Sequence, residues 1–323
     1  MDPARLTAKI RAALAPCSLG AWPTPLEPAP ELAAACGVAA LALKREDRSS
    51  AGCGGNKVRG LEFLLAGAAP GTVFVTVGGS GSTHCLATAV HAAALSCRAV
   101  LAQFPQPVTA ASWAIAQACA RRAALVVRAR ARATFPLAVL AAWRRARALG
   151  SRRWIPGGGA HPRAVVGHVL GGLELEQQLD APPDVIVAPL GTGGTVAGLG
   201  LAMATLGWPT QVVGVRVAPV AVANRWRTAA LASGARRLLE RHGIALPVPR
   251  APLVVNGLGR GYGWPTAAGE HARHRAAEHG LIVDPCYGAK ALAALPALGA
   301  RGFRRVVFWH TFGVPLPDRE PVP

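Results

Sequence analysis

The sequence predicts a two-domain α/β protein in which helices cover both faces of open, twisted parallel sheets. Short runs rich in β-branched residues alternate with longer alanine-rich stretches, which is typical of βαβ units. Several of the short runs are almost continuously apolar, as expected for strands covered on both faces. Three glycine-rich segments follow predicted strands, where the loops of α/β proteins commonly carry function.

The predicted elements alternate along most of the chain, with two irregular interruptions. Glycine-rich stretches at residues 154–162 and 256–265 break the rhythm and indicate hinges or active-site loops. We expect strands at residues 38–44, 72–77, 99–104, 125–128, 185–188, 211–217 and 305–310. We expect helices at residues 56–68, 82–94, 112–122, 136–149, 162–179, 194–206 and 266–280.

The composition indicates a protein without membrane association. The 323 residues are 51% hydrophobic, yet no apolar run approaches the roughly 20 residues that cross a bilayer. Residues 1–16 lack the apolar centre of a secretory signal, so we expect a cytoplasmic location. The seven cysteines form no C-x-x-C pair, and we expect them to be small buried hydrophobic residues in a reducing compartment.

The formal charge of +19 raises the hypothesis of a nucleic-acid-binding protein. The arginines are scattered, however, and their densest stretch, residues 121–132, is short. Aromatic residues make up only 5% of the chain and show no stacking pattern of the kind that single-strand binders use. The sequence therefore favours a solvated arginine-rich surface over a nucleic-acid site.

A rare lysine marks the first candidate site. The chain has four lysines, and Lys57 directly follows a glycine-rich loop and Asn56, a residue that favours the start of a helix. The positive end of a helix disfavours a cation and lowers the pKa of an amine, which suits a nucleophile. An ordinary exposed charge at a helix start is the alternative interpretation. Because arginine cannot form an imine, Schiff-base chemistry would depend on one of Lys9, Lys44, Lys57 and Lys290.

The second candidate site is a glycine-rich loop between a predicted strand and a predicted helix. Glycines allow the backbone to approach an anion, and a helix N-terminus presents free N–H groups to it. A dinucleotide turn or a simple tight turn are alternatives, but there is no strict G-x-G-x-x-G and no acid about twenty residues on. The loop favours a single phosphate. Its residues are Gly191, Thr192, Gly193, Gly194 and Thr195.

Further candidates lie in three other segments. The turn G-G-S-G-S-T-H, residues 78–84, could bind a substrate carboxylate near Ser82 and Thr83, or could be a turn that Ser82 caps; the residues leave both open. The chain has two tyrosines, and both lie in irregular segments, where they are better placed for proton transfer than on a helix. These residues are Tyr262 and Tyr287, and Thr311 follows a predicted strand end.

In this order the segments resemble the fold-type II pyridoxal-phosphate enzymes, in particular the D-cysteine desulfhydrase and 1-aminocyclopropane-1-carboxylate deaminase family. The resemblance runs from G-G-N-K-V-R-G-L-E-F through G-T-G-G-T, G-Y-G-W-P-T and D-P-C-Y-G-A-K to F-W-H-T-F-G, about eighty-five per cent of the chain. It implies a tryptophan synthase β-like fold with a large cofactor domain, residues 1–50 and 163–323, and a small inserted domain, residues 51–162. It also implies a homodimer.

The resemblance implies a lyase or deaminase that acts on a small amino acid and uses pyridoxal 5'-phosphate. Lys57 would hold the cofactor as a Schiff base and move protons, and residues 191–195 would hold its phosphate. Ser82, Tyr262 and Tyr287 match catalytic residues of the family. Asn56, Thr83 and Thr311 complete the expected cofactor contacts.

Four positions depart from the family pattern. The family commonly has Asn at the position of Thr83, Thr or Glu at Gly288, Gly at Phe312, and Lys at Gly60, where the lysine helps to bind the phosphate. The Thr or Glu that is usual at position 288 can bond the pyridine nitrogen of the cofactor, which Gly288 cannot do. Thr311 could replace this partner. The alternative hypothesis is a catalytically altered protein of this fold with a ligand-binding or regulatory role.

Overall fold

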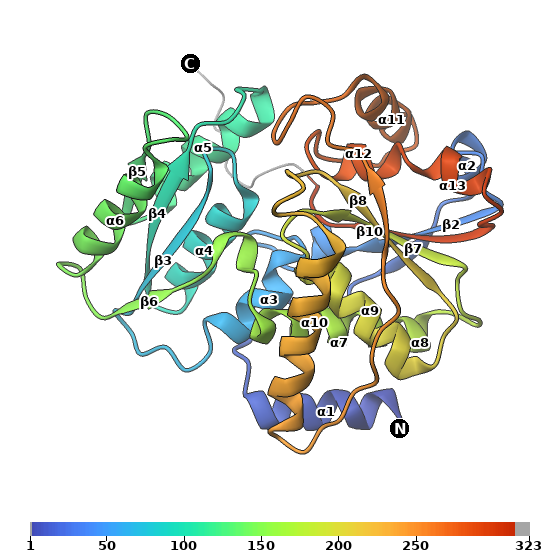
Figure 1. Ribbon diagram of the computed structural model, residues 1–323, viewed down its shortest axis with the longest axis horizontal. Coiled ribbons are helices and arrows are strands. Elements are labelled where there is room, and N and C mark those ends of the chain that lie inside the picture. The colour runs from blue at the N-terminus through green and yellow to red at the C-terminus, as the bar shows by residue number, and fades with distance from the viewer. Residues whose placement is uncertain (1, 314–323) are drawn as a thin grey trace.

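Two sheets form the framework of the protein (Figure 1). The computed structural model describes residues 2–313. The larger sheet has six strands in the order β1-β2-β10-β7-β8-β9, and every neighbouring pair is parallel except β1 and β2. Its strands are β1 (Leu26–Pro28), β2 (Ala40–Arg45), β7 (Val185–Leu190), β8 (Gln211–Arg216), β9 (Leu253–Asn256) and β10 (Arg305–His310).

Helices cover both faces of the six-stranded sheet. One face packs on α1 (Pro3–Leu14), α7 (Pro162–Leu173), α9 (Gly194–Leu206) and α10 (Arg225–Glu240), and α8 (Leu175–Gln178) follows α7. The other packs on α2 (Pro30–Ala35), α11 (Ala267–Glu278), α12 (Gly288–Leu292) and α13 (Leu295–Gly299). In Figure 1 these two groups lie below and above the sheet. The strands between them are almost wholly apolar, because neither face meets water.

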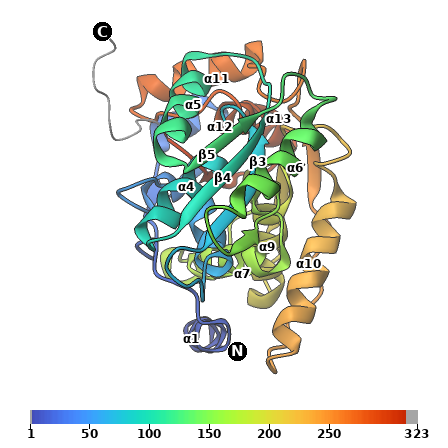
Figure 2. The ribbon, with the colours of Figure 1, turned by 90° about the vertical axis from the view of Figure 1, so that its left-hand side faces the viewer.

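The smaller sheet is parallel throughout and has the strand order β5-β4-β3-β6. Helices α4 (Thr83–Ala94) and α5 (Ala110–Arg122) cover one face and α6 (Phe135–Ala146) the other (Figure 2). Its strands are β3 (Val73–Gly79), β4 (Arg98–Phe104), β5 (Leu125–Arg128) and β6 (Arg152–Trp154). The α/β fold with parallel sheets and helices on both faces is confirmed. The domain boundaries at residues 50/51 and 162/163 stay a prediction.

Helix α3 (Lys57–Leu64) connects the two hydrophobic cores. Phe63 packs into the core of the large sheet, whereas Leu61 and Leu64 pack into that of the small sheet. Helix α3, which carries Lys57, is therefore held by both cores.

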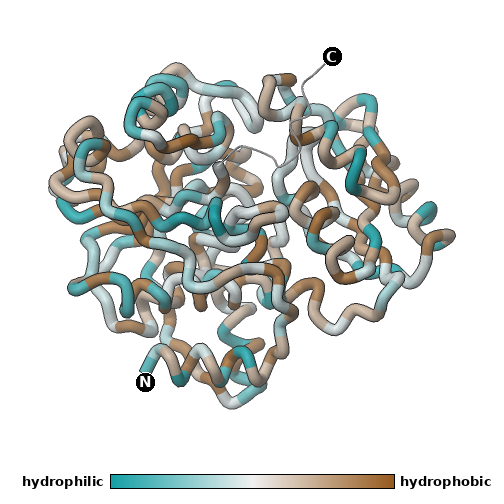
Figure 3. Tube along the Cα trace, turned by 180° about the vertical axis from the view of Figure 1, so that it is seen from behind, coloured by the Kyte–Doolittle hydropathy of each residue, from teal (hydrophilic) through white to brown (hydrophobic). Residues whose placement is uncertain are grey.

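The outer helix α1 is amphipathic. The tube in Figure 3 alternates between hydrophilic and hydrophobic residues along this helix, next to the N-terminus, and the helix buries Leu6 and Ile10 one turn apart.

The structure adds elements that the sequence did not predict. Strands β1, β6 and β9 are three or four residues long, too short to show a period, and β6 reads Arg-Arg-Trp. Helix α10 is rich in arginine, and its apolar face gave no clear pattern. The seven cysteines are free, and five of them are buried, as expected. Among residues 2–313, no helix is long and apolar enough to cross a membrane.

Candidate active site

One cavity of about 440 Å³ brings the predicted site residues together. It is lined from both sheets, by the ends of β3 and β4 and by the loop that follows β7. In parallel sheets the loops at the carboxyl ends of the strands converge in this way. The twelve residues singled out from the sequence all line it: Asn56, Lys57, Ser82, Thr83, Gly191, Thr192, Gly193, Gly194, Thr195, Tyr262, Tyr287 and Thr311.

The backbone before Lys57 is held by a compact loop. Gly55 has a φ of 131°, and its N–H donates both to the Glu46 carbonyl, at 2.9 Å, and to Ser49 Oγ, at 3.0 Å. The next N–H, that of Asn56, donates to the Thr311 carbonyl at 2.9 Å. A side chain at position 55 would be strained at this φ and would press on Phe312. The glycine therefore lets α3 begin with Lys57 at the cavity.

The amine of Lys57 has no hydrogen-bond or ion-pair partner among the described residues, whereas the other three lysines have partners. Lys9 donates to the Gly243 carbonyl, Lys290 to the Leu258 carbonyl, and Lys44 to three acceptors. Burial lowers the pKa of Lys57 to about 8. The direction agrees with the sequence-based expectation, but the cause is loss of solvent. Most of this amine is therefore still charged at neutral pH, but its uncharged fraction, about a tenth at pH 7, is far larger than that of a solvated lysine.

Asn56 has a different role from the one its position predicts. It precedes α3, but its side chain makes no capping hydrogen bond there. Instead its Nδ2 donates to Thr195 Oγ1 at 2.7 Å, across 139 residues of sequence. The expectation of a side-chain cap is wrong, because a partner from the glycine-rich loop competes for the same amide. This bond ties that loop to the segment that carries Lys57.

The loop of residues 191–195 forms an open cradle. Gly193 has a φ of 96° and precedes α9, and no described side chain caps that helix. A Cβ atom added at Gly193 would be strained at this φ and would lie 3.0 Å from Thr228 Oγ1, so the loop needs a glycine where it packs against α10. An uncapped helix start with a glycine before it is suited to an anion.

On the opposite side, Ser82 caps α4. Its Oγ accepts a hydrogen bond from the Cys85 N–H at 3.3 Å, while Ser82 and Thr83 both line the cavity. The cap and the cavity position coexist, so the two interpretations of this turn do not exclude each other. His84 also lines the cavity, with Nε2 2.9 Å from Thr76 Oγ1. Burial and the charge of Lys57 lower its pKa to about 3, so the imidazole is neutral.

The two tyrosines form a hydrogen-bonded pair. The hydroxyl of Tyr287 donates to that of Tyr262 at 2.8 Å, and the rings meet edge to face. Burial raises the pKa of both phenols, so both are protonated near neutral pH. Tyr262 accepts the hydrogen bond from Tyr287, so the O–H of Tyr262 is free to donate a hydrogen bond to a bound molecule.

Asp284 orients the tyrosine segment, which the sequence did not predict. Its two oxygens accept the N–H groups of Cys286, Tyr287 and Gly288 at 2.7–2.9 Å. Burial raises the pKa of the carboxyl despite these bonds. A Cβ atom at Gly288 would lie 3.2 Å from Asp284 Oδ2, so the absence of a side chain there belongs to this turn. The sequence signal that could have indicated this role is the position of Asp284 three residues before Tyr287, in D-P-C-Y.

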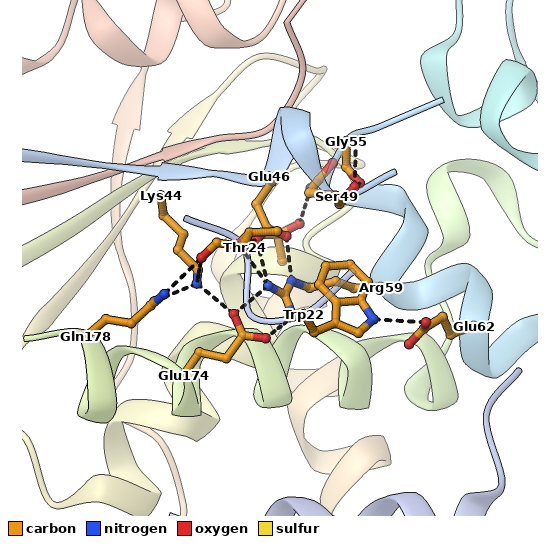
Figure 4. Close-up of polar contacts among 12 residues, drawn as sticks. Trp22, Thr24, Lys44, Glu46, Ser49, Gly55, Arg59, Glu62, Glu174 and Gln178 are labelled. Carbon is orange, nitrogen blue, oxygen red and sulfur yellow. Dashed lines mark hydrogen bonds and ion pairs between the residues drawn. The ribbon is translucent and has the colours of Figure 1, made fainter. Parts of the chain in front are cut away.

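A network of charges surrounds Arg59 of α3 (Figure 4). Arg59 makes paired contacts with the carboxylates of Glu46 and Glu174 at 2.6–2.8 Å and stacks 4.0 Å above the Trp22 ring. Lys44 Nζ lies 2.6 Å from Glu174 Oε2. The charges of the two cations, Arg59 and Lys44, offset those of the two carboxylates, and the network connects α3 with β2 and with the end of α7.

The cavity fits pyridoxal phosphate by its donor set. The cofactor has an aldehyde, which needs a free amine, and a phosphate, which needs N–H and hydroxyl donors. Lys57 supplies the amine, and the cradle of residues 191–195, with the uncapped start of α9 and the hydroxyls of Thr192 and Thr195, supplies the donors.

Comparison with known proteins agrees with this donor set. The model of the family described as pyridoxal-phosphate dependent enzyme matches residues 17–311. A nocardicin C-9' epimerase of Nocardia uniformis subsp. tsuyamanensis is 34% identical over 83% of this chain and 85% of its own length. A D-cysteine desulfhydrase of Klebsiella pneumoniae is 31% identical over 91% of this chain and 92% of its own.

A solved structure of a 1-aminocyclopropane-1-carboxylate deaminase homologue superimposes with a TM-score of 0.80, at 28% identity, over 95% of both chains. The family match spans nearly all of the described chain and includes Lys57, the glycine-rich segments at residues 78–84 and 191–195, and both tyrosines. The chain belongs to the pyridoxal-phosphate dependent enzymes, and its cofactor is pyridoxal 5'-phosphate.

Proposed function

We propose that this enzyme removes ammonia from a small amino acid by elimination or ring opening, with formation of a 2-oxo acid. The observation that supports the proposal most is that an unpartnered amine of low pKa and a protonated tyrosine pair line one cavity. When bound, pyridoxal phosphate withdraws electrons from Cα of an amino acid, so that a proton there becomes removable.

The residues of this chain divide the remaining tasks. Lys57 holds the cofactor and, once released, accepts the Cα proton. The N–H groups at the start of α4, near Ser82 and Thr83, bind the substrate carboxylate. Residues 191–195 bind the phosphate, and Asn56 and Thr311 hold the walls of the cofactor site. Tyr262 donates a proton to the leaving group, supported by Tyr287, because its O–H is not engaged by another described residue.

A second candidate reaction is epimerisation at Cα. The epimerase relative has a higher identity to this chain than the desulfhydrase described above, although it covers less of it. Epimerisation needs the same removal of the Cα proton by Lys57, followed by return of a proton to the opposite face, and no leaving group. The supporting observation is a second proton source in the cavity, the tyrosine pair.

One experiment separates these reactions from the ligand-binding alternative. The holoenzyme is incubated in D₂O with both enantiomers of cysteine, β-chloroalanine and serine and with 1-aminocyclopropane-1-carboxylate. Lys57→Ala serves as the control. The proposal predicts 2-oxo acid and ammonia from at least one compound and none with the variant. Deuterium at Cα with inversion and no ammonia would favour epimerisation. Binding without exchange for every compound would contradict both reactions.

We further propose that the enzyme is a cytoplasmic homodimer, in line with the resembled family. Seven free cysteines are compatible with a reducing compartment. Light scattering on the purified holoenzyme tests the assembly, and a mass of one chain, 33.2 kDa, would contradict it.

A further inference from the structure

The cavity has more positive than negative side chains on its wall. Among the described residues that line it, Lys57, Arg132 and Arg227 are the cations and Asp284 is the carboxylate. Asp284 is already engaged by three backbone N–H groups. Arg132 stands 5.8 Å over the ring of Phe104, at the end of the small sheet. Arg227 has no ion-pair partner among the described residues, and the tasks proposed above do not use it.

Arg227 belongs to the first turn of α10, which lies directly on the glycine-rich loop. A Cβ atom added at Gly193 would lie 3.0 Å from Thr228 Oγ1 and 3.6 Å from Thr228 Cα. Arg227 precedes Thr228, is exposed, and lines the cavity together with Thr192 and Gly193. The helix cap fixes its backbone, because the Arg227 N–H donates to Asn224 Oδ1 at 2.8 Å.

The charge of this turn is unusual for a helix start. The positive end of a helix favours acidic residues, yet the first turn of α10 holds Arg225 and Arg227 and no acid. Arg225 stacks on the ring of Trp226 at 4.6 Å and faces a separate hollow beside Pro249. Arg227 faces the cavity instead. An anion bound there would offset the unfavourable charge.

Helix α3 offers no second cation to the loop. Its third residue is Arg59, whose guanidinium is engaged by Glu46 and Glu174. At Gly60 the helix packs so closely on α7 that an added Cβ atom would lie 3.0 Å from Ala164 Cβ. A long basic side chain therefore has no room at that point of α3. Arg227 is the cation that the structure leaves for the loop side of the cavity.

We propose that Arg227 binds the phosphate of the cofactor from α10, as a charged partner outside the glycine-rich loop. The inference rests on the proposed position of the phosphate at residues 191–195. Helices α9 and α10 then both present their N-terminal ends to one dianion, and the guanidinium supplies charge that backbone donors lack. Arg227 is a cofactor-binding residue and takes no part in the proton transfers.

The test compares pyridoxal phosphate with pyridoxal, which has the same aldehyde and no phosphate. The full-length protein is stripped of cofactor and titrated with each compound, and absorbance at roughly 410–430 nm reports the bond to Lys57. Loss of one charge-assisted hydrogen bond predicts that Arg227→Gln weakens binding of pyridoxal phosphate about 10- to 100-fold. Binding of pyridoxal should change by less than about twofold, because the removed contact is absent there.

Three variants complete the design. Arg225→Gln is the matched control, with the same charge change in the same turn, and should leave both affinities unchanged. Arg227→Lys should keep most of the affinity, because a cation remains. Gly193→Ala tests the cradle itself, since the added methyl group is strained at a φ of 96° and fills the space beside Thr228.

Each outcome decides between the two levels of the proposal. Selective weakening of pyridoxal phosphate in Arg227→Gln supports the inference. Equal weakening of both compounds, or equal effects of Arg225→Gln and Arg227→Gln, overturns it. Suppose that Gly193→Ala weakens binding of pyridoxal phosphate but not of pyridoxal, and that Arg227→Gln changes neither. The phosphate then lies at residues 191–195, and the proposed role of Arg227 is wrong. If neither variant is selective, the phosphate does not lie at the loop, and both proposals fail.

Discussion

Lys57 and Arg59 lie two residues apart on α3 and have opposite surroundings. Arg59 is buried among carboxylates that satisfy its guanidinium, over an aromatic ring, with an exposed fraction of 2%. Lys57 faces the cavity, and its amine has no partner among the described residues. Residues at positions i and i+2 point to opposite sides of a helix, so one short helix separates the two environments.

The difference shows how this protein keeps an unsatisfied amine in place. The Arg59 network fixes α3 to β2 and α7, and the Glu46 backbone also accepts the Gly55 N–H beside Lys57. Stabilising contacts are concentrated on one side of α3, and unpaired polar groups on the other. Stability and reactivity should therefore respond to different substitutions.

The largest effect is expected where the network is broken. Arg59→Ala leaves the buried Glu46 and the half-buried Glu174 with Lys44 as their remaining cation, and should lower the free energy of unfolding by about 3–5 kcal/mol. Urea unfolding of the protein measures it. Arg48→Ala, which breaks an exposed ion pair with Glu27, is the matched control and should cost less than about 1 kcal/mol. Equal losses in the two variants would contradict the special role of the network.

A smaller effect, on the catalytic step, is expected on the cavity side. Tyr262→Phe removes the proposed proton donor and should lower kcat about 100-fold with little change in KM. Tyr287→Phe keeps the Tyr262 hydroxyl and should lower kcat about tenfold. Steady-state kinetics on any substrate that the enzyme accepts measures both. Unchanged kcat in Tyr262→Phe would remove the tyrosine pair from the mechanism.

The unpaired amine should also make stability depend on pH in the cofactor-free protein. The pKa of Lys57 is about 8 in the folded state and 10.5 as the reference value, so the unfolded chain holds more protons between these pH values. Stability should therefore rise with pH across this range. The shielded ammonium of Lys57 lowers the free energy of unfolding below pH 8, and this loss disappears as the pH rises to 10.5. The gain in stability over this range is about 2 kcal/mol once partial screening by solvent is allowed for.

The matched variant for this measurement is Lys57→Met, which has no titrating group at this position. The difference in unfolding free energy between the two proteins should shrink as the pH rises from 8 to 10.5. A difference that stays constant over this range would show that the amine is not held in a shielded environment.

The smallest effect separates a helix cap from a substrate contact. Ser82→Ala removes the cap of α4 and should cost about 1 kcal/mol of stability. Asp2→Ala removes the cap of α1, which lies away from the cavity, at a similar cost. The two variants should differ in activity, because Ser82 also lines the cavity. Equal activity would reduce Ser82 to a structural residue.

The sequence predicted the parts of the site that are local. A scarce lysine after glycines, a glycine loop between strand and helix, and two tyrosines in irregular segments are visible in short windows. Their convergence follows from the strand ends of an α/β fold. The long central strands were equally clear, because they are apolar on both faces.

Contacts between distant segments were not predictable. Arg59 finds one carboxylate 13 residues away and another 115 residues away, and no period relates such partners. Asn56 matched a helix cap locally, yet Thr195 takes its amide. Arg227 lies on a helix whose arginine-rich sequence hides its apolar face, so its approach to the cavity needed the fold.

The central claim is that Lys57, the lysine without a partner among the described residues, holds the cofactor. Borohydride reduction of the holoenzyme, followed by proteolysis and mass spectrometry of the lysine-containing peptides, tests it directly. The account predicts a reduced cofactor adduct on Lys57 and none on Lys9, Lys44 or Lys290, whose amines are engaged elsewhere. An adduct on another lysine, or none on a protein that carries the cofactor, would contradict it.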